Sequence, residues 1–500
     1  MRRESIFRLP LFDRKVFGWC PTASREIINS LIYFAQKKTK GYFYLLKTIF
    51  DQIITQINFM ENQLKKGVSR RQFLGTAAIG LAGVAMFSSL SACKQKVVDT
   101  DLKLGFIGMG QQAMFLLNGF LQIPGVKVVA GCDVYGVKRQ RFEKKVKEFY
   151  TKAGKEIEVQ TYEKFEDILS RADINAVVIA VPDHSHARIA IAACKAGKDV
   201  YLEKPMTFTI KEGQELRKTV RETNRILAVG SQQRSDPNFQ HAVNLVQSGA
   251  LGQIEKVNAY VGAPPKPYDL PEETLPADLN WDLWLGSLPT PIHYNSQLNP
   301  PITVEPEQNE QFWGGWRWYK EMGGGFTTDW GAHMFDIAQW GLGMDKSGPV
   351  EISPIGDGTE FMQFVYANGV VMTSEPFDEQ KTKGVKFIGK DGWIEVSRGS
   401  FKASDDKFLP PPAKEGDTGP YETKIPHQIN FIESVLQRKD PVVPVEIGHS
   451  SCTVCTLGNI ACELKRTIKW DPATETFVDD ADGAAAKLLH YEYRAGYSLT

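Results

Sequence analysis

The sequence predicts an α/β protein in which a doubly wound parallel sheet is followed by an α+β domain with a mostly antiparallel open sheet. Three observations support this prediction. A buried strand pattern runs into a glycine-rich turn that opens a helix. Strand and helix patterns then alternate as far as residue 230, and the strands beyond it follow one another without intervening helices. Alternating strands and helices are typical of a parallel sheet, whereas consecutive strands are typical of an antiparallel one.

The glycine-rich turn, Gly108-x-Gly110-x-x-Ala113, follows the first expected strand, Leu102–Ile107. A helix is expected from Gln111 to Gln122, and a second strand, Val126–Cys132, finishes at Asp133. A strand, a glycine turn, a helix, a second strand and an acid, in this order, form the dinucleotide-binding fingerprint of a Rossmann domain.

Each part of the fingerprint has an expected task. Gly108 permits the tight turn, Gly110 lets the backbone approach a pyrophosphate, and Ala113 allows the helix to pack closely on the strand. The pyrophosphate would lie at the helix N-terminus. The charge of Asp133 favours the ribose hydroxyls of NAD and disfavours the 2′-phosphate of NADP. The expected cofactor contacts here are Gly108, Met109, Gly110, Gln111, Ala113 and Asp133.

The alternation continues through three more expected strands, 175–181, 198–203 and 226–230, and through the helices between them. Ligands of such sheets bind at the carboxyl ends of the strands. Residues at these ends complete the expected cofactor contacts, with the nicotinamide near Lys204. They are Val181, Pro182, His186, Glu203 and Lys204.

The second half reads as a run of strands interrupted by a proline-rich excursion, 264–306. Further on, three glycines at 323–325 lead into an expected helix that carries Asp329, His333 and Asp336. Spacings of i, i+4 and i+7 place these side chains on one helix face. Together with the ammonium of Lys204 they suit proton transfer coupled to hydride transfer, because histidine titrates near neutrality and an aspartate can orient it. A buried packing pair is one alternative. A metal site is another, although no cysteine or third histidine lies nearby.

The stretch 313–319, just before these glycines, is dense in aromatic residues. Indole rings and a guanidinium can form a platform for a pyranose, with the sugar's C–H faces over the rings. Packing of buried aromatics between domains explains the stretch equally well. The expected substrate contacts are Arg234, Trp316, Arg317 and Asp336.

Three motifs together resemble the Gfo/Idh/MocA oxidoreductases: the glycine turn, the sequence Pro182-Asp183-His184-Ser185-His186, and the strand end Glu203-Lys204-Pro205. The resemblance extends over nearly all of residues 101–500, with Ala113 in place of the usual third glycine. It implies an NAD(P)-dependent oxidoreductase, no metal, and a Lys-Pro bond that is often cis. It also implies that Lys204, Asp329 and His333 occupy the catalytic positions. The second domain would contact substrate and often forms an oligomer interface, so a homo-oligomer (dimer or tetramer) is expected.

A leader is expected ahead of the folded body. Arg70-Arg71 precedes the uncharged stretch Phe73–Leu90, which is rich in glycine, alanine and serine. Twin-arginine signals address a folded-protein export route, so the chain could leave the cytoplasm with its nucleotide bound. The sequence Leu90-Ser91-Ala92-Cys93 resembles a lipoprotein processing site, which makes Cys93 the expected lipidation site on the periplasmic side of the membrane. An uncleaved single-helix anchor is the alternative.

Domain boundaries follow from these assignments. A signal should lie near the start of a chain, and Met60 with the charged residues after it would make a normal beginning. Residues 1–59 are therefore interpreted as a mis-called N-terminal extension. The signal is expected at 60–93, a tether at 94–100, the NAD-binding domain at 101–230 and the substrate domain at 231–500.

Composition limits the partners. Lys plus Arg and Asp plus Glu each total 59, so nothing indicates a nucleic-acid partner. Among the seven cysteines, Cys452-x-x-Cys455 has redox spacing but lies in an expected helix. Core packing is therefore expected there rather than a redox or metal role.

These expectations indicate an exported NAD-dependent oxidoreductase that acts on a sugar, polyol or glycoside. Free NAD is not expected outside the cytoplasm, so the cofactor would be tightly bound and regenerated in place. An NAD-dependent glycosidase, working by transient oxidation and elimination, would use the same residues and is the alternative. A non-catalytic sugar-binding lipoprotein would be expected to lack part of the catalytic set, and all three residues are present.

Overall fold

The computed structural model describes residues 101–289, 291–305, 313–412 and 425–499. By its internal contacts the chain divides into two units, and the unit Val97–Thr500 contains all of the described residues. The expected extension, signal and tether, with Arg70, Arg71 and Cys93, lie outside the described residues.

The first half forms a six-stranded sheet in which every neighbouring pair of strands is parallel, as predicted. The strand order is β3-β2-β1-β4-β5-β6, so the order reverses beside β1, the strand that enters the glycine turn. Five of the six strands are buried at all or all but one of their residues, which is typical of a sheet covered on both faces. The bounds are β1 Leu102–Ile107, β2 Val126–Cys132, β3 Gln160–Tyr162, β4 Ala176–Ile179, β5 Asp199–Leu202 and β6 Leu227–Val229.

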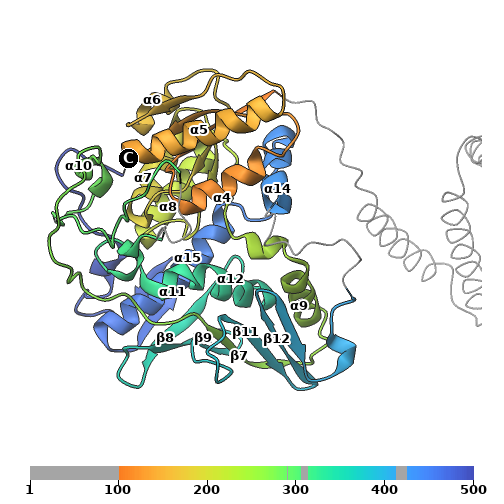
Figure 1. Cartoon of the computed structure of the whole chain (residues 1–500). Helices are drawn as coiled ribbons and strands as arrows, with labels where there is room; N and C mark the ends of the chain where they lie inside the picture. Colours follow the sequence, from red (N-terminus) through yellow and green to blue (C-terminus); the bar gives the residue numbers. More distant parts are fainter. Residues whose placement is uncertain (1–100, 290, 306–312, 413–424, 500) are drawn as a thin grey trace, which may run out of the picture. The chain divides into compact units, whose positions relative to one another are not determined.

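Helices cover both faces of this sheet (Figure 1). One face packs against α4 (Gln111–Phe120), α5 (Gly136–Lys152) and α14 (Ile425–Gln437). The other packs against α6 (Phe165–Leu169), α7 (Asp183–Lys195), α8 (Ile210–Glu222) and the first part of α15 (Val445–Leu464). The layers around the first sheet therefore include helices from far beyond residue 230.

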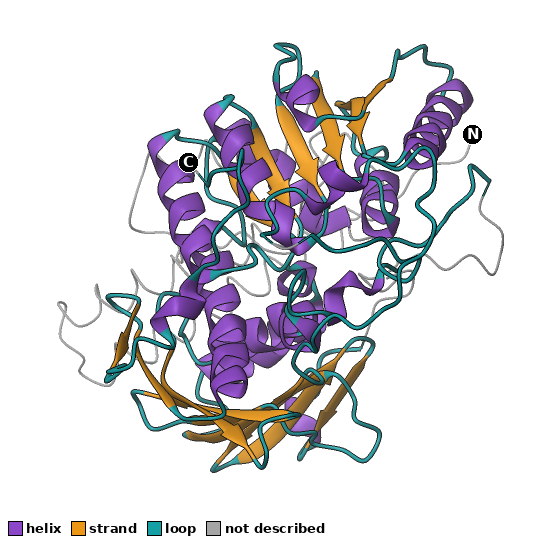
Figure 2. Cartoon of the chain, turned by 90° about the vertical axis from the view of Figure 1, so that its left-hand side faces the viewer, coloured by secondary structure: helices purple, strands orange, loops and turns teal. Residues whose placement is uncertain are grey.

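The second half forms a nine-stranded sheet of order β13-β12-β11-β7-β10-β9-β8-β14-β15. Only β7 and β10 pair in parallel, so the sheet is mostly antiparallel, as predicted. Helices α9 (Pro237–Gln247), α12 (Gly331–Gly341) and α15 pack on one of its faces and lie between the two sheets (Figure 2). The bounds are β7 Ile254–Tyr260, β8 Pro349–Ile355, β9 Phe361–Tyr366, β10 Val371–Thr373, β11 Gly384–Gly389, β12 Gly392–Ser397, β13 Ser400–Ala403, β14 Ile468–Asp471 and β15 Thr476–Val478.

Helix α15 belongs to both halves. Val445 and Cys452, in its first part, lie in the core beneath the first sheet. Val454 and Leu457, further along, lie in the core of the second sheet. Most of its residues are buried, as in a helix that is surrounded by protein on all sides.

The single helix expected after the three glycines is interrupted. It consists of α11 (Gly325–Asp329) and α12, with Trp330 between them. Gly325 has a φ of +67°, and a Cβ there would collide with the backbone of Pro264 and Pro265. This close approach packs α11 against the start of the proline-rich excursion. The excursion and the aromatic stretch contain α10 (Trp281–Leu285) and the 3₁₀ turn η2 (Gly315–Trp318); other 3₁₀ turns are η1 (Gln232–Ser235), η3 (Asp406–Phe408) and η4 (Ala486–Leu489).

The five cysteines within the described residues are buried and form no disulfide. Burial raises the pKa of Cys452 to about 11, so this thiol stays protonated and unreactive at neutral pH. The prediction of core packing for Cys452 and Cys455 is confirmed. None of the helices in the described ranges combines the length and apolar character needed to cross a bilayer.

Candidate active site

A cleft of about 1140 Å³ opens at the carboxyl ends of the first sheet's strands. Its lining comes from the ends of β1, β2, β4 and β5, from α7, from the aromatic stretch near residue 316, and from α11 and α12. The strand order reverses here, which is where open α/β sheets bind ligands. Both halves of the chain therefore contribute to one site.

The glycine turn leaves room for a phosphate group. Gly108 has a φ of +86°, and a Cβ there would collide with the carbonyl group of Ala180, so only glycine fits. At Gly110 no atom lies within 4 Å of the position that a Cβ would take. Helix α4 begins at Gln111, so its first N–H groups lie beside this open space. These features fit the pyrophosphate of a dinucleotide.

Asp133 borders the cleft at the end of β2, as predicted. Its Oδ2 accepts from the N–H of Met109 at 2.8 Å, and its Oδ1 accepts from the N–H of Tyr135 at 2.9 Å. The carboxylate is thus held in a defined orientation, and each oxygen keeps capacity to accept from a ribose hydroxyl.

Met109 was predicted to contact the cofactor, but its side chain does not line the cleft. Its side chain packs in the core beside Phe106 and Phe142 rather than lining the cleft, and its N–H is used by Asp133. Ala113 is buried in the same core, where it allows the close helix–strand packing expected of it. Met109 therefore shapes the turn, with its thioether in the core and its N–H bonded to Asp133.

The loop between β4 and α7 supplies Val181, Pro182 and His186 to the cleft lining. The two ring nitrogens of His186 lie 2.7 Å from the carbonyl oxygen of Pro205 and 3.0 Å from that of Val181. Burial lowers the pKa of His186 to about 4, so the ring is neutral near pH 7. His186 therefore holds the loop against the segment that carries Lys204.

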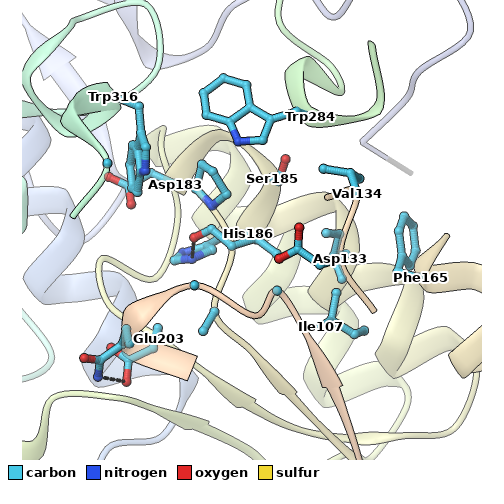
Figure 3. Close-up of a pocket in the computed structure, with 18 of the residues that line it drawn as sticks. Ile107, Asp133, Val134, Phe165, Asp183, Ser185, His186, Glu203, Trp284 and Trp316 are labelled. Carbon is cyan, nitrogen blue, oxygen red and sulfur yellow. Dashed lines mark hydrogen bonds between the residues drawn. The ribbon is translucent and has the colours of Figure 1, made fainter. Parts of the chain in front are cut away.

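Glu203 borders the cleft, but its carboxylate is occupied. Its Oε1 accepts from Nε2 of Gln112 and from Nε2 of Gln232, both at 2.8 Å. In Figure 3 Glu203 lies well away from Asp133 and Phe165. Glu203 thus ties the end of β5 to α4 and η1.

Lys204 and Asp329 form an ion pair across the cleft. Nζ of Lys204 donates to Oδ1 and to the backbone oxygen of Asp329, both at 2.8 Å, and the Lys204–Pro205 peptide is cis. The side chains are 15% and 18% exposed, so the pair is shielded but reachable. Burial raises the pKa of Asp329, but Lys204 and Arg317 outweigh this effect and hold the pKa below its usual range. Asp329 is therefore an anion at neutral pH.

His333 lies on α12, one turn beyond Asp329, and borders the same cleft. The ring is buried and packs edge-on against Trp330, with 6.2 Å between ring centroids. The cleft thus brings together the three predicted catalytic residues, Lys204 from the end of β5 and the other two from α11 and α12.

The aromatic stretch forms a wall of the cleft beside Asp329. The Arg317 guanidinium lies over the rings of Trp313 and Trp316, at 5.1 and 4.4 Å from their centroids. Its Nη1 donates to the Gly314 oxygen at 2.8 Å, and its Nε is 3.6 Å from Oδ1 of Asp329. Cation–π contacts hold this cation in place. Trp316 and Arg317 both line the cleft, as the prediction of a sugar platform requires.

Arg234 and Asp336 do not line the cleft, which contradicts their prediction as substrate contacts. Arg234 donates from Nε and Nη2 to the two carboxylate oxygens of Asp336, both at 2.8 Å, and also pairs with Asp345. Ser451 donates to Asp336 as well. The Arg234 and Asp336 side chains are 2% and 1% exposed. Because these groups satisfy one another in the core, the pair joins η1 to α12.

Asp183 is a cleft residue to which sequence reasoning assigned no role. It opens α7, is only 4% exposed, and makes no hydrogen bond or ion pair with any described residue. Burial raises the pKa of Asp183 to about 8, although Arg317 and Lys204 oppose the shift. The side chain therefore carries a proton at neutral pH. An acid at the start of the helix that follows β4 was the available signal, and Figure 3 labels it among the residues that line the pocket.

Further lining residues come from parts of the chain that no sequence motif connects to the fingerprint. They include Trp284 and Asn299 of the excursion, Phe165 and Arg188 of the first domain, and Tyr497. Their contribution depends on how distant segments pack. Within the described ranges, no group of three or more His, Cys, Asp or Glu side chains is arranged to hold a metal ion.

A parallel-sheet domain with a glycine turn and a strand-end acid, facing a Lys–Asp–His cluster, defines a nicotinamide-dependent oxidoreductase site. Comparison with known families agrees. Residues 102–231 match the oxidoreductase family described as having an NAD-binding Rossmann fold, and residues 244–499 match its C-terminal alpha/beta domain. The chain belongs to the Gfo/Idh/MocA oxidoreductase family, and its first domain is of the NAD-binding type.

The curated relatives include proteins named as dehydrogenases and proteins named as glycosyl hydrolases. Inositol 2-dehydrogenase of Salmonella typhimurium is 28% identical over 191 residues, which cover 37% of this chain and 54% of that protein. A glycosyl hydrolase family 109 protein of Parabacteroides distasonis is 31% identical over 200 residues, which cover 37% of this chain and 43% of that protein. The chain spans about half the length of the curated relatives it matches.

Solved structures share the fold. The WlbA dehydrogenase from Bordetella pertussis, in complex with NADH and UDP-GlcNAcA, superposes with a TM-score of 0.53 at 17% identity, covering 74% of this chain and 98% of that one. Levoglucosan dehydrogenase in complex with NADH superposes with a TM-score of 0.50 at 18% identity, with the same coverage. At these identities the likeness concerns the fold alone.

Proposed function

We propose that this protein is an NAD-dependent oxidoreductase that acts on a sugar, polyol or glycoside. The observation that carries the proposal is the single cleft in which the open glycine turn and Asp133 lie together with Lys204, Asp329 and His333. NAD, rather than NADP, would be held by Gly108, Gly110, Gln111 and the strand-end residues. Trp316 and Arg317 would receive the sugar ring. The names of the dehydrogenase relatives support this substrate class.

The division of labour follows from the contacts. When bound, NAD supplies the hydride acceptor for a substrate C–H bond. His333 would take the proton of the substrate hydroxyl, because a neutral imidazole is an effective base near pH 7. Lys204 would donate a hydrogen bond to the same oxygen. Asp329 holds the ammonium of Lys204 in place through its 2.8 Å contacts.

An NAD-dependent glycosidase is the second candidate, and Asp183 favours it. Expulsion of an aglycone by elimination leaves an alkoxide that needs a proton, and simple alcohol oxidation has no such step. A buried carboxyl that still carries its proton at neutral pH can supply it. Similarity to glycosyl hydrolase family 109 proteins supports the same candidate.

One experiment separates these functions. Native protein is purified, and the nucleotide released on denaturation is identified by mass spectrometry; NAD or NADH is expected. Free polyols and p-nitrophenyl glycosides are then offered without added NAD. Reduction of bound nicotinamide by polyols, without release of nitrophenol, supports the oxidoreductase. Catalytic release of nitrophenol supports the glycosidase, and a protein without nucleotide or nucleotide affinity would overturn both.

We also propose that the protein is exported through its twin-arginine signal and anchored by a lipid on Cys93, on the periplasmic side of the membrane. The proposal rests on residues 60–93 of the sequence. Cys93→Ala should abolish labelling with a palmitate analogue, and Arg70→Lys with Arg71→Lys should leave the protein in the cytoplasm. Unchanged fractionation of both variants would contradict it. A homo-oligomer is expected as well, and light scattering of the purified protein would test this.

A further inference from the structure

The C-terminal segment 490–499 lies against the first domain, and its last residues border the cleft. Gly496, Tyr497, Ser498 and Leu499 all belong to the cleft lining. Arg188 on α7 contacts both Tyr497 and Phe165 at the start of α6, and these residues line the cleft together with Asp133 and Val134 after β2. Figure 3 shows Phe165 near Val134 and Asp133, and far from Glu203 and Trp316.

The expected orientation of NAD assigns this end of the cleft. With the pyrophosphate at Gly110 and the nicotinamide toward Lys204, the adenosine half must extend past Asp133, whose carboxylate suits the ribose hydroxyls. Segment 490–499 therefore borders the region that the adenosine half would take. Neither the fingerprint nor the strand ends account for this part of the site.

The segment is held there by specific contacts. The Arg188 guanidinium lies between two rings, 4.8 Å from the centroid of Phe165 and 5.0 Å from that of Tyr497. Arg494 donates from Nη1 to Oδ1 of Asp282 at 2.7 Å and from Nη2 to the hydroxyl of Tyr497 at 3.2 Å. Arg188 and Arg494 therefore both contact Tyr497 and position its ring.

A second anchor lies at the other end of the segment. The Tyr493 hydroxyl donates to Oε1 of Glu212 at 2.6 Å. Glu212 also caps α8, where its carboxylate accepts from the N–H of Thr209 at 3.0 Å. Leu499, past the ring of Tyr497, packs against the core beneath the first sheet. The segment is therefore fastened before, at and after the cleft.

We infer that segment 490–499 is part of the NAD site and that Tyr497, which packs against the Arg188 guanidinium, closes the adenosine end so that the cofactor is retained. This inference rests on the proposed function, because it requires NAD in the cleft. The ligand group at this end would be the purine ring of NAD. Such a ring stacks on aromatic side chains and on guanidinium groups. An enzyme whose cofactor must stay bound through many turnovers would need such a closure.

The test measures NAD retention rather than turnover. The full-length protein is loaded with NAD and freed of excess nucleotide by gel filtration. It is then diluted into an NAD-consuming enzyme system so that release can be followed. Tyr497→Ala should release NAD about tenfold faster than wild type, because one buried cation–π contact and the closing ring are lost. Tyr497→Phe keeps the ring and should release NAD slowly, and Glu492→Ala, at an exposed position in the same segment, should behave as wild type.

Each outcome decides between the inference and its premise. Release from Tyr497→Ala as slow as from wild type, with wild type retaining NAD, would overturn the inference and leave the proposed function intact. A wild-type protein that neither contains nor binds NAD would overturn the proposed function itself. If Tyr497→Ala fails to fold, Arg494→Met tests the same closure by removing its anchor; slow release from that variant would contradict the inference and fast release would support it.

Discussion

Two ion pairs link the first domain and the segment after it to α11 and α12. They differ in how much hydrogen-bonding capacity their carboxylates keep for a ligand. Lys204 and Asp329 meet at 2.8 Å on the cleft surface, and Oδ2 of Asp329 accepts no hydrogen bond from a described residue. Arg234 and Asp336 meet at the same distance in the core, and Arg234 and Ser451 together bond both oxygens of Asp336. A pair that serves chemistry keeps capacity for a ligand, whereas a saturated pair serves the fold.

Removing Arg234 should have the largest effect, and it should fall on stability. Arg234→Met leaves Asp336 buried without its partner, so the free energy of unfolding should fall by about 3–5 kcal/mol. Chemical denaturation monitored by circular dichroism measures this. Lys103→Met, which breaks a partly exposed pair with Asp173, is the control and should cost less than about 1 kcal/mol. A stable Arg234→Met protein that has lost turnover would restore Arg234 as a substrate contact.

Substitution of the catalytic residues in the cleft should instead affect turnover. Lys204→Met and His333→Ala should each lower kcat by about two orders of magnitude or more, the size of lost acid–base help. The thermal unfolding midpoint should change little, and bound NAD should remain because neither residue contacts the adenosine half. Stopped-flow absorbance of the nicotinamide band gives the rates. Normal turnover by His333→Ala would show that the ring is only structural.

Asp183 combines features of both aspartates. It is buried like Asp336, but its carboxyl group has no hydrogen-bond or ion-pair partner among the described residues and borders the cleft. Its pKa of about 8 in the folded protein lies above the 3.8 of an ordinary aspartate, so folding favours the protonated form. Its contribution to stability is complete below pH 4 and is lost as the pH rises toward 8. Asp183→Asn should therefore gain stability relative to wild type across this range. Denaturation at pH 5, 7 and 9 would show it, and a constant difference would contradict the assigned pKa.

A smaller effect is expected at the cofactor end of the cleft. Asp133→Ser removes the charge that accepts from the ribose, so NAD binding should weaken about tenfold, as for a lost hydrogen bond to a charged group. NADP should lose less, because the repulsion of its 2′-phosphate disappears at the same time. Calorimetric titration of both nucleotides measures the ratio of their affinities. An unchanged ratio would indicate that Asp133 does not face the ribose.

Much of the fold was predictable because its signals are local. The strand before Gly108, the turn itself and the acid after β2 lie within one short stretch, and the structure has them in the predicted order. The positions of Lys204 and Asp329 were predictable for a related reason, since a strand end and a glycine-led helix each specify where a side chain emerges.

The roles of some residues could not be predicted from the sequence, for a physical reason. Charge at positions 234 and 336 is equally compatible with a ligand contact and with a buried pair, and only the packing of η1, α12 and α15 decides between them. Tyr497 lies about 300 residues beyond the residues it accompanies, and no local pattern connects such distant segments. Helical spacing also misplaced Asp336, because its carboxylate lies in the core, where Arg234 and Ser451 bond it.

The position of helix α15 has a consequence for how this protein unfolds. The first part of this helix packs in the core of the first sheet and the later part in the core of the second. Unfolding of either sheet would therefore expose apolar side chains of a helix that also packs against the other sheet. A protein built from two independent domains would show two heat-absorption peaks. Here scanning calorimetry of residues 101–500 should show one, with calorimetric and van't Hoff enthalpies in agreement.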